Sequence, residues 1–471
     1  MKGANKVALL GGGGLRTPLL IHGMAQAQST LGVGDLAIYD IDPRRATLMA
    51  KLGELLVRDT GIHITAPADL EEAVDGATFV LSSIRVGGMA ARAQDERIAI
   101  EHGFAGQETT GPGGLAMGLR TIPVALSHAR LIEAYAPKAW LINFTNPAGM
   151  ITQALINHSN VRVIGICDTP SELFHRIAWS LDEPFEQLEF RYLGLNHLGW
   201  VNAVRRHGED LMPRLLDDSE ALAKLYPAHL FDPALIRSIR LIPTEYLYFY
   251  YSQRRALRNQ QAAGASRGEE ILRLNTALLI GLEADLSEEK PFHALERYKQ
   301  YLNQRNASYM RLEGNAESAF AQGQHDWNPF EGETGYHRIA IDVMLALLSE
   351  DPRTIVVNVR NGDEGLLDLA PGDVIEAPSV ISRYGVQPLP VGKAPEAVQA
   401  LLMAVKGYER LAIRAAVEKS FDLARLALLA NPIVNDWDAA GDLLNALVTA
   451  DEQYLGDLSG ATISSRQAGR Q

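Results

Sequence analysis

Two polar stretches in the first half of the chain carry side chains that suit metal binding or sugar binding. Ile142–Gly149 reads INFTNPAG, and Gly165–Pro170 reads GICDTP. Asn196 and His197 follow a third apolar run. Each apolar run predicts a buried strand, so the polar residues are expected at strand ends. Ends of neighbouring strands meet at one edge of a sheet, where ligands bind.

Cys167 and His197 lie close enough along the chain to share a metal ion if their strands are neighbours. A thiolate and an imidazole both bind divalent transition metals. Only two protein ligands are evident, so water or substrate would complete the shell, as in catalytic metal sites. Spacing alone favours the alternative, in which a buried cysteine is inert and the histidine is satisfied by hydrogen bonds.

A glycine-rich turn near the N-terminus indicates a dinucleotide site. The apolar run Val7–Leu10 ends in Gly11, Gly12, Gly13 and Gly14, and a helical pattern runs from about Pro18 to Leu31. Glycines here let the backbone approach a pyrophosphate, and the helix N-terminus supplies amide donors. The third glycine of the usual fingerprint is replaced by Arg16, so the turn alone also fits a flexible connector.

Asp40 ends the next predicted strand, Leu36–Asp40. An acid at that place accepts hydrogen bonds from the adenosine ribose and disfavours a 2′-phosphate, which favours NAD over NADP. The alternative is that Asp40 caps the helix that follows Pro43. A further strand at Ala77–Leu81 precedes Ser82–Gly88, which predicts cofactor contacts from Ser83 and Arg85.

The alternation of strands and helices predicts an α/β fold. We expect a Rossmann-like, doubly wound parallel sheet followed by a mixed α+β, helix-rich second lobe. The expected division is residues 1–186 for NAD binding, 187–458 for substrate, metal and oligomer contacts, and 459–471 as a flexible tail.

Two segments receive more specific interpretations. Gly106–Gly114 is rich in glycine and polar residues and predicts a loop, either a binding loop or a plain connector. The helix that follows, Leu115–Tyr135, is expected to be interrupted near Pro123. The aromatic segment Leu241–Tyr251 predicts mostly core rings, with room for one functional tyrosine.

Composition excludes several functional classes. The chain has 471 residues, 47% of them hydrophobic and 21% charged, with a net charge of −13. The acidic balance argues against nucleic acid as a partner. No apolar run is long enough for a signal peptide or a membrane span. The single cysteine fits a reducing, cytoplasmic setting.

These motifs together resemble glycoside hydrolase family 4, the NAD- and manganese-dependent glycosidases, and most nearly its 6-phospho-β-glucosidase branch. The likeness is carried by Gly11–Gly13, Ile84–Gly88, Gly106–Gly114, Ile142–Gly149, Gly165–Pro170, Gly194–Trp200 and Tyr246–Leu247. It covers most of the chain in the right order. These enzymes depart from hydrolysis by two carboxylates.

The resemblance implies a role for each matching residue. Cys167 and His197 match the metal ligands, Tyr246 matches the catalytic base, and Asp168 matches a proton donor found mainly in α-specific members. An acid of that kind in an otherwise β-like sequence leaves the anomeric preference open.

The resemblance also implies contacts with the substrate. Arg92, Asn146 and Arg267 match substrate-binding positions. The family often has serine after the third glycine, whereas this chain has Gly14-Leu15-Arg16. Binding of a 6-phosphate therefore stays open, although Arg16 could supply charge for one. A homo-oligomer, a dimer or tetramer, is expected.

The implied mechanism oxidises the sugar before cutting it. NAD takes a hydride from carbon 3, the metal polarises the resulting ketone, and a tyrosine whose pKa the metal lowers removes the carbon 2 proton. The aglycone then leaves, water adds, and the hydride returns. The alternatives are the same chemistry on an α-linked, galacto-configured or unphosphorylated glycoside, an NAD-dependent hydroxy-acid dehydrogenase, and a non-catalytic NAD sensor.

Overall fold

The computed structural model describes residues 4–226, 230–310, 328, 330–332 and 334–458. The expected tail, residues 459–471, lies outside the described residues. Within the described part of the chain, no helix combines the length and the apolar character that crossing a bilayer requires.

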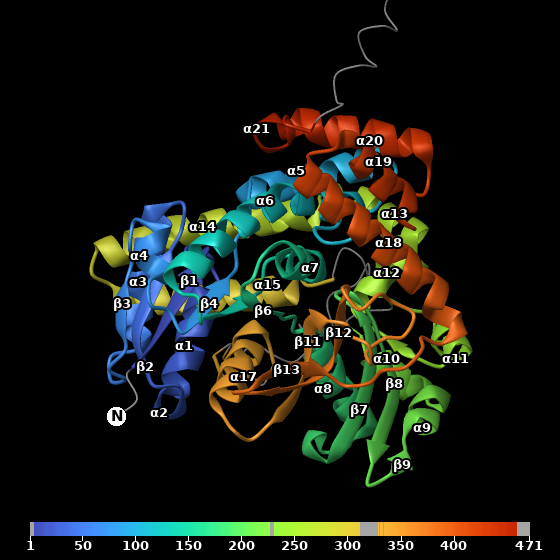
Figure 1. The fold of residues 1–471 in the computed structure, drawn as a ribbon, viewed down its shortest axis with the longest axis horizontal. Helices are drawn as coiled ribbons and strands as arrows, with labels where there is room; N and C mark the ends of the chain where they lie inside the picture. Colours follow the sequence, from blue (N-terminus) through green and yellow to red (C-terminus); the bar gives the residue numbers. More distant parts are fainter. Residues whose placement is uncertain (1–3, 227–229, 311–327, 329, 333, 459–471) are drawn as a thin grey trace, which may run out of the picture.

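The N-terminal part forms the predicted doubly wound parallel sheet. Its strands lie in the order β3-β2-β1-β4-β5-β6 (Figure 1). Their bounds are β1 Asn5–Leu10, β2 Val33–Tyr39, β3 His63–Thr65, β4 Phe79–Ser82, β5 Trp140–Asn143 and β6 Arg162–Gly165. β1 reverses the winding direction between β2 and β4, so the crevice at their carboxyl ends is the expected ligand site.

Alternate residues of these strands face two hydrophobic cores. Ala8 and Leu10 pack on one face, and Val7 and Leu9 on the other. The helices that cover these faces are α1 Thr17–Gln26, α2 Gln28–Leu31, α3 Pro43–Leu56, α4 Leu70–Val74, α5 Gly88–Glu101, α6 Gly111–Tyr135, α7 Ala148–His158 and α8 Thr169–Leu181. α1 shares the second core with the later helix α17, Tyr336–Leu348, whereas α6 and α7 belong to the first.

Three strands from far along the chain extend the same sheet. β11 Arg353–Arg360, β12 Val374–Ser382 and β13 Gly385–Pro388 continue it beyond β6. β11 meets β6 in antiparallel sense at Asn358 and Gly165. The second part of the chain therefore completes the first sheet as well as forming its own. The division of the chain at residue 186 stays a prediction.

The second sheet is small and antiparallel. It contains β7 Leu188–Leu195, β8 Leu198–Arg206, β9 Glu209–Asp210 and β10 Ile242–Pro243. β7 and β8 form a hairpin whose two-residue turn is Asn196-His197, because Leu195 pairs with Leu198. The sequence predicted both strands but not the tight turn between them.

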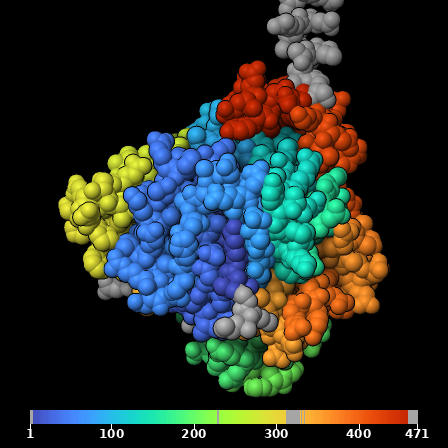
Figure 2. All heavy atoms as spheres, turned by 60° about the vertical axis from the view of Figure 1, so that its left-hand side comes forward, coloured from blue at the N-terminus to red at the C-terminus, as the bar shows by residue number. Residues whose placement is uncertain are grey.

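Helices make up most of the second lobe, as expected. They are η1 Phe185–Gln187, α9 Met212–Asp217, α10 Ser219–Lys224, α11 Pro233–Ile239, η2 Glu245–Leu247, α12 Tyr248–Tyr251, α13 Gln253–Ala263, α14 Arg267–Ser287, α15 Pro291–Ala307, α18 Glu396–Glu418, α19 Phe421–Ala430, α20 Trp437–Ala450 and α21 Glu452–Leu455. Figure 2 shows one face, with α14–α15 in yellow beside the blue N-terminal segment and the antiparallel sheet in green below it.

Two expectations about the Gly106–Tyr135 region are wrong. α6 begins at Gly111, so the second half of the predicted loop is the first turn of a helix, with Pro112 in the first turn. Proline suits that place because its missing N–H has no helical partner there. α6 also continues through Pro123 without interruption. Burial of most of the helix outweighs the local cost of the proline.

Candidate active site

Cys167 and His197 meet at the carboxyl edge of the parallel sheet. Cys167 follows β6, and His197 stands at the tip of the β7–β8 hairpin with a φ of 60°. That left-handed conformation is uncommon for residues other than glycine. The Sγ atom of Cys167 lies 3.4 Å from Nε2 of His197. Both side chains are buried. The expected juxtaposition is confirmed, and their role as metal ligands stays a prediction.

The pair fits one divalent ion. Ligand bonds of about 2.3 Å to sulfur and about 2.1 Å to nitrogen, at angles of about 90–109°, place the two atoms about 3.1–3.6 Å apart. In the described residues, no group of three or more His, Cys, Asp and Glu side chains is arranged around a metal position. Two protein ligands leave room for substrate or water in the shell, as the sequence predicted.

Both groups are uncharged before any metal binds. Burial raises the pKa of the Cys167 thiol well above its usual value, and Glu376 and Asp168 add to the rise. Burial lowers the pKa of His197 to about 4. A neutral imidazole is ready to bind a metal, whereas the thiol must first lose its proton.

Tyr246 lies directly on the metal-ligand candidate His197. The two rings stack with centroids 3.7 Å apart and planes within 8°. Burial raises the pKa of the Tyr246 phenol well above 10, and Glu108 and Glu245 add to the rise. This rise belongs to the chain without a metal ion, and a lowering of the pKa of Tyr246 by a bound metal stays a prediction. The chain's own residues thus hold Tyr246 as the neutral phenol.

An acidic cluster, defined as Asp168, Glu172 and Glu245, lies near this pair, since Glu245 contributes to the raised pKa of Tyr246. Asp168 stands at the N-terminus of α8, and Oδ2 lies 3.7 Å from Nη1 of Arg16. Glu172 pairs with Arg176 at 3.4 Å. Burial raises the pKa of Asp168, with Glu245 adding to the rise, although Arg16 opposes it. Burial and Asp168 raise the pKa of Glu172 to about 8.

An arginine cluster, defined as Arg85, Arg92, Glu96 and Glu108, also lies near the pair, since Glu108 influences the pKa of both His197 and Tyr246. Oε2 of Glu108 lies 2.7 Å from Nη2 of Arg85 and 2.8 Å from Nη1 of Arg92. Nε of Arg92 also donates to Glu96 over 2.8 Å. Burial alone would raise the pKa of Glu108, but the arginines outweigh it and lower the pKa to about 2.

Arg267 and Asn146 lie around the arginine cluster and the sheet edge. Arg267 begins α14, where it pairs with Glu270 at 2.7 Å. The next residue, Gly268, donates its backbone N–H to Glu96 over 2.6 Å, which ties α14 to the arginine cluster. Asn146 follows β5, is partly exposed and precedes Pro147. Their predicted substrate contacts stay predictions.

The glycine turn fits a dinucleotide. A Cβ on Gly11 would lie 2.6 Å from the Ser83 carbonyl oxygen, and one on Gly13 would lie 2.8 Å from the Asp40 carboxylate. Gly13 donates its backbone N–H to Oδ2 of Asp40 over 2.9 Å. The turn, Asp40 and Ser83 therefore lie at one place, as predicted. The N-cap of α3 is Asp42, so the capping interpretation of Asp40 is wrong.

Arg85 offers a free donor at the same edge. Its Nη1 atom is buried and has no hydrogen-bond partner in the described part of the chain. An anionic ligand beyond the sheet edge would satisfy it, which fits the predicted cofactor contact.

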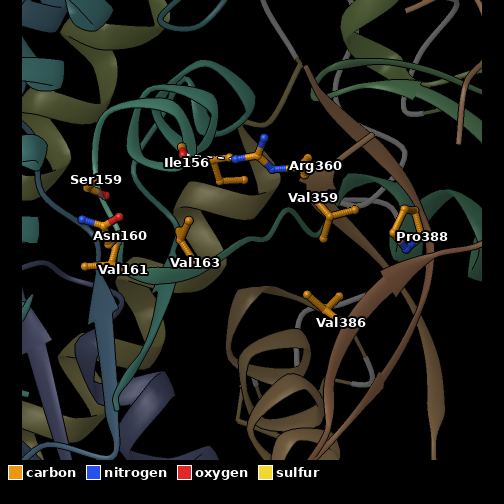
Figure 3. Close-up of a pocket in the computed structure, with 9 residues that line it drawn as sticks. All are labelled: Ile156, Ser159, Asn160, Val161, Val163, Val359, Arg360, Val386 and Pro388. Carbon is orange, nitrogen blue, oxygen red and sulfur yellow. Dashed lines mark hydrogen bonds between the residues drawn. The ribbon is translucent and has the colours of Figure 1, made fainter. Parts of the chain in front are cut away.

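The hollow in Figure 3 is a different place. Its volume is about 330 Å³, and its lining residues are Ile156, Ser159, Asn160, Val161, Val163, Val359, Arg360, Val386 and Pro388. It lies by the amino end of β6, whereas Cys167 follows the carboxyl end. It therefore belongs to the sheet extension and not to the candidate active site.

Several residues of the site were missed in the sequence. Glu108 lies inside the predicted polar loop, and its neighbour Thr109 contacts His197. Glu245 directly precedes Tyr246 and accepts a hydrogen bond from Tyr309 over 2.9 Å. A charged residue in a glycine-rich loop was a usable signal for Glu108. Tyr336, whose ring lies 4.1 Å under the Arg16 guanidinium, gave no local signal.

Two family models match the chain. One, described as family 4 glycosyl hydrolase, matches residues 6–183. The other, described as the C-terminal domain of family 4 glycosyl hydrolase, matches residues 192–434. Together they span both the parallel sheet and the second lobe.

Relatives match along almost the whole chain. A probable 6-phospho-beta-glucosidase of Bacillus subtilis is 30% identical, over 96% of this chain and 97% of its own. A 6-phospho-alpha-glucosidase of Lacticaseibacillus paracasei is 28% identical, over 96% of this chain and 98% of the relative. The structure of the 6-phospho-beta glucosidase of Thermotoga maritima was solved with manganese, NAD+ and glucose-6-phosphate. It superposes on this chain with a TM-score of 0.78 at 26% identity, over 96% of this chain and 99% of the other.

Proposed function

The chain belongs to family 4 of the glycosyl hydrolases, and we propose that it cleaves a 6-phosphorylated β-glucoside with the help of NAD and a divalent metal, manganese by preference. One observation carries the proposal: Sγ of Cys167 and Nε2 of His197 lie 3.4 Å apart at the carboxyl edge of a Rossmann-like sheet, and the His197 ring stacks on that of Tyr246. Relatives of similar length are named 6-phospho-beta-glucosidases, which supports this substrate class.

The residues at the glycine turn support NAD as the cofactor. Gly11, Gly12, Gly13 and Gly14 would lie against the pyrophosphate, and Asp40 would accept from the ribose hydroxyls. Asp40 also accepts a hydrogen bond from the backbone N–H of Gly13, so one carboxylate would both fix the turn and contact the ribose. Ser83 and Arg85 would complete the contacts.

The metal would be held by Cys167 and His197. When bound, NAD supplies reversible hydride transfer at sugar carbon 3, and the metal supplies Lewis acidity beside that carbon. Tyr246 would take the proton from carbon 2 as its phenolate, and the charge of a metal held by His197, whose ring stacks on that of Tyr246, would favour this ionised form. Arg92, Asn146 and Arg267 would orient the sugar from the arginine cluster and the sheet edge.

Asp168 would protonate the leaving glycosidic oxygen. Burial raises the pKa of its carboxyl group, which suits a proton donor. An α-linked substrate is the second candidate, since a 6-phospho-alpha-glucosidase is also among the relatives that match along the whole chain. Asp168 follows the sheet edge directly after Cys167, so it would be close to the scissile bond in either case.

A panel of nitrophenyl glycosides tests the proposal. Both anomers of the glucoside and galactoside, each with and without a 6-phosphate, are assayed with NAD and manganese present, and again after dialysis and chelation. We expect turnover of the 6-phospho-β-glucoside that depends on both additions. Turnover that survives removal of both would contradict the mechanism, and preference for an α-linked or unphosphorylated substrate would replace the proposed substrate.

Cys167→Ser tests the metal site separately. A neutral hydroxyl is a poorer ligand for a divalent cation than an anionic thiolate, so manganese affinity should fall at least about tenfold. Calorimetric titration measures it, with wild type and Cys167→Ser compared at one pH. Unchanged affinity would remove Cys167 from the metal shell.

Assembly and location are also proposals. We propose a homo-oligomer, supported by large exposed apolar side chains on α14 and α15, where Ile280 is 64% and Phe292 73% exposed. Light scattering would measure the mass in solution. A cytoplasmic setting is supported by the single cysteine, which has no disulfide partner.

A further inference from the structure

We infer that Thr109, held by Gln107, is the positioning residue that fixes the tautomer of His197 and so directs the free Nε2 lone pair toward the metal position. The inference rests on the proposed metal site and assigns the residues that prepare it. It follows from a chain of three buried hydrogen bonds in which each direction is determined by the one before.

The chain begins at the Gln107 side-chain oxygen. Oε1 lies 2.5 Å from the backbone nitrogen of Thr109 and 2.8 Å from that of Thr110. A backbone N–H can only donate, so the atom that receives both must be the amide oxygen and not the nitrogen. Oε1 of Gln107 is therefore an acceptor only.

The second step is the Thr109 hydroxyl. Its Oγ1 lies 2.8 Å from Oε1 of Gln107. Because that oxygen cannot donate, the one hydroxyl proton of Thr109 points to it. Oγ1 of Thr109 then has only lone pairs to offer to other partners.

The third step is His197. Nδ1 lies 2.7 Å from Oγ1 of Thr109, so Nδ1 must carry the ring proton and donate it. A neutral imidazole has one ring proton, and Nε2 is left with its lone pair free. That lone pair faces Sγ of Cys167, where a shared ion would lie. Ligating histidines generally donate their other N–H in this way.

The loop that carries Thr109 is buried and packs closely against the first turn of α6. Side chains of Gln107, Thr109 and His197 are all buried. A Cβ on Gly113 would lie 2.2 Å from the Gln107 carbonyl oxygen, and one on Gly114 would lie 2.3 Å from that of Thr109. These two glycines let the first turn of α6 pack onto the loop, which explains why a glycine pair stands there.

The test compares two adjacent threonines. Thr109→Val removes the hydroxyl at nearly constant shape, and Thr109→Ser keeps it. Thr110→Val is the matched control, because Thr110 is buried and contacts the same Gln107 oxygen at 3.4 Å but not His197. Manganese alone is titrated into each full-length variant by calorimetry. We expect Thr109→Val to lose about 10–100-fold in affinity, Thr109→Ser to stay within about threefold of wild type, and Thr110→Val likewise.

A second measurement reads the tautomer without metal. Nitrogen-15 chemical shifts of ring-labelled histidines, recorded by solid-state NMR with His197→Ala for assignment, distinguish a protonated Nδ1 from a protonated Nε2. Wild type should show Nδ1–H, and Thr109→Val should show a mixture or Nε2–H. Equal manganese affinity of Thr109→Val and wild type, or a wild-type Nε2–H tautomer, would overturn the inference. Failure of wild type to bind manganese would instead overturn the proposed metal site, and the shifts would still decide the tautomer.

Discussion

The acidic cluster and the arginine cluster shift the pKa of a partly buried glutamate in opposite directions. Glu172 has its pKa raised to about 8, whereas Glu108 has its pKa lowered to about 2. Glu108 lies within 2.8 Å of two guanidinium groups, and Glu172 has one at 3.4 Å beside two further acids. Burial penalises both carboxylates, so the number of close arginines decides the direction of each shift.

This difference divides the candidate site into two chemical environments. The arginine cluster consists of paired charges, and the Nη1 atom of Arg85, which has no hydrogen-bond partner in the described part of the chain, is the donor in it that suits an anionic sugar or cofactor. In the acidic cluster, burial raises the pKa of both Asp168 and Glu172, which suits acid catalysis by Asp168. Tyr246 is influenced by both clusters, because burial raises its pKa and Glu108 and Glu245 add to the rise.

The largest expected effect is from Tyr246→Phe, which removes the group that both clusters act on. Turnover should fall by about 10²–10⁴-fold, because a general base contributes that much. NAD affinity, measured by fluorescence titration, should stay unchanged. Tyr250→Phe serves as a control from the same aromatic segment, and its turnover should stay within about threefold of wild type. Full activity of Tyr246→Phe would refute its assignment as the base.

Glu108→Gln should break the arginine cluster. Loss of the shared carboxylate removes the ion pair of the partly buried Arg85 and leaves the buried Arg92 with Glu96 alone, so the free energy of unfolding should fall by about 3–5 kcal/mol at pH 7. Urea denaturation measures it. Since the folded pKa of about 2 is below the usual 4.5, the stabilisation exists above pH 4.5 and disappears as pH falls toward 2.

The difference in the free energy of unfolding between Glu108→Gln and wild type should therefore become smaller as the pH falls. Glu54→Gln, an exposed substitution on α3, is the control and should change stability by no more than about 0.5 kcal/mol. A stability loss for Glu108→Gln no greater than that of the control would show that the arginines do not depend on this carboxylate.

The smallest expected effect is from Glu172→Gln, in the acidic cluster, and it has the opposite pH dependence. The folded pKa of about 8 exceeds the usual 4.5, so the folded protein binds an extra proton between those values. The contribution of Glu172 to the free energy of unfolding of wild type is therefore greatest below pH 4.5 and is lost as the pH rises through 8. Glutamine cannot ionise and does not lose stability in this way. From pH 5 to pH 9, the free energy of unfolding of the variant should therefore rise by about 1–3 kcal/mol relative to that of wild type. Parallel stability curves would refute the raised pKa.

The sequence was sufficient to predict the parallel sheet and its cofactor edge. Alternating apolar runs and helical patterns are local signals, and the glycine turn, Asp40, Ser83 and Cys167 each follow a strand by position alone. The hairpin that brings His197 to Cys167 was not predictable in the same way. Its turn, Asn196-His197, lacks the glycine that usually marks a two-residue turn.

Other features depend on contacts between distant segments. Glu245 and Glu172 act together only because α8 and η2 meet in space, and neither segment carries a sign of the other. The polar loop before α6 was recognised as a possible binding loop, but the roles of Gln107, Glu108 and Thr109 depend on their hydrogen-bond partners. The long helix through Pro123 was misjudged because local propensity was outweighed by burial.

The extension of the first sheet by β11, β12 and β13 has a consequence during synthesis. While the ribosome makes the chain, β6 is complete long before Asn358 arrives to pair with Gly165. Until then the nascent sheet has an open edge, and open edges invite pairing with other chains. An N-terminal fragment that ends near residue 186 would keep that edge permanently. Such a fragment is expected to aggregate when expressed alone, and nascent chains of this length are expected to need a chaperone.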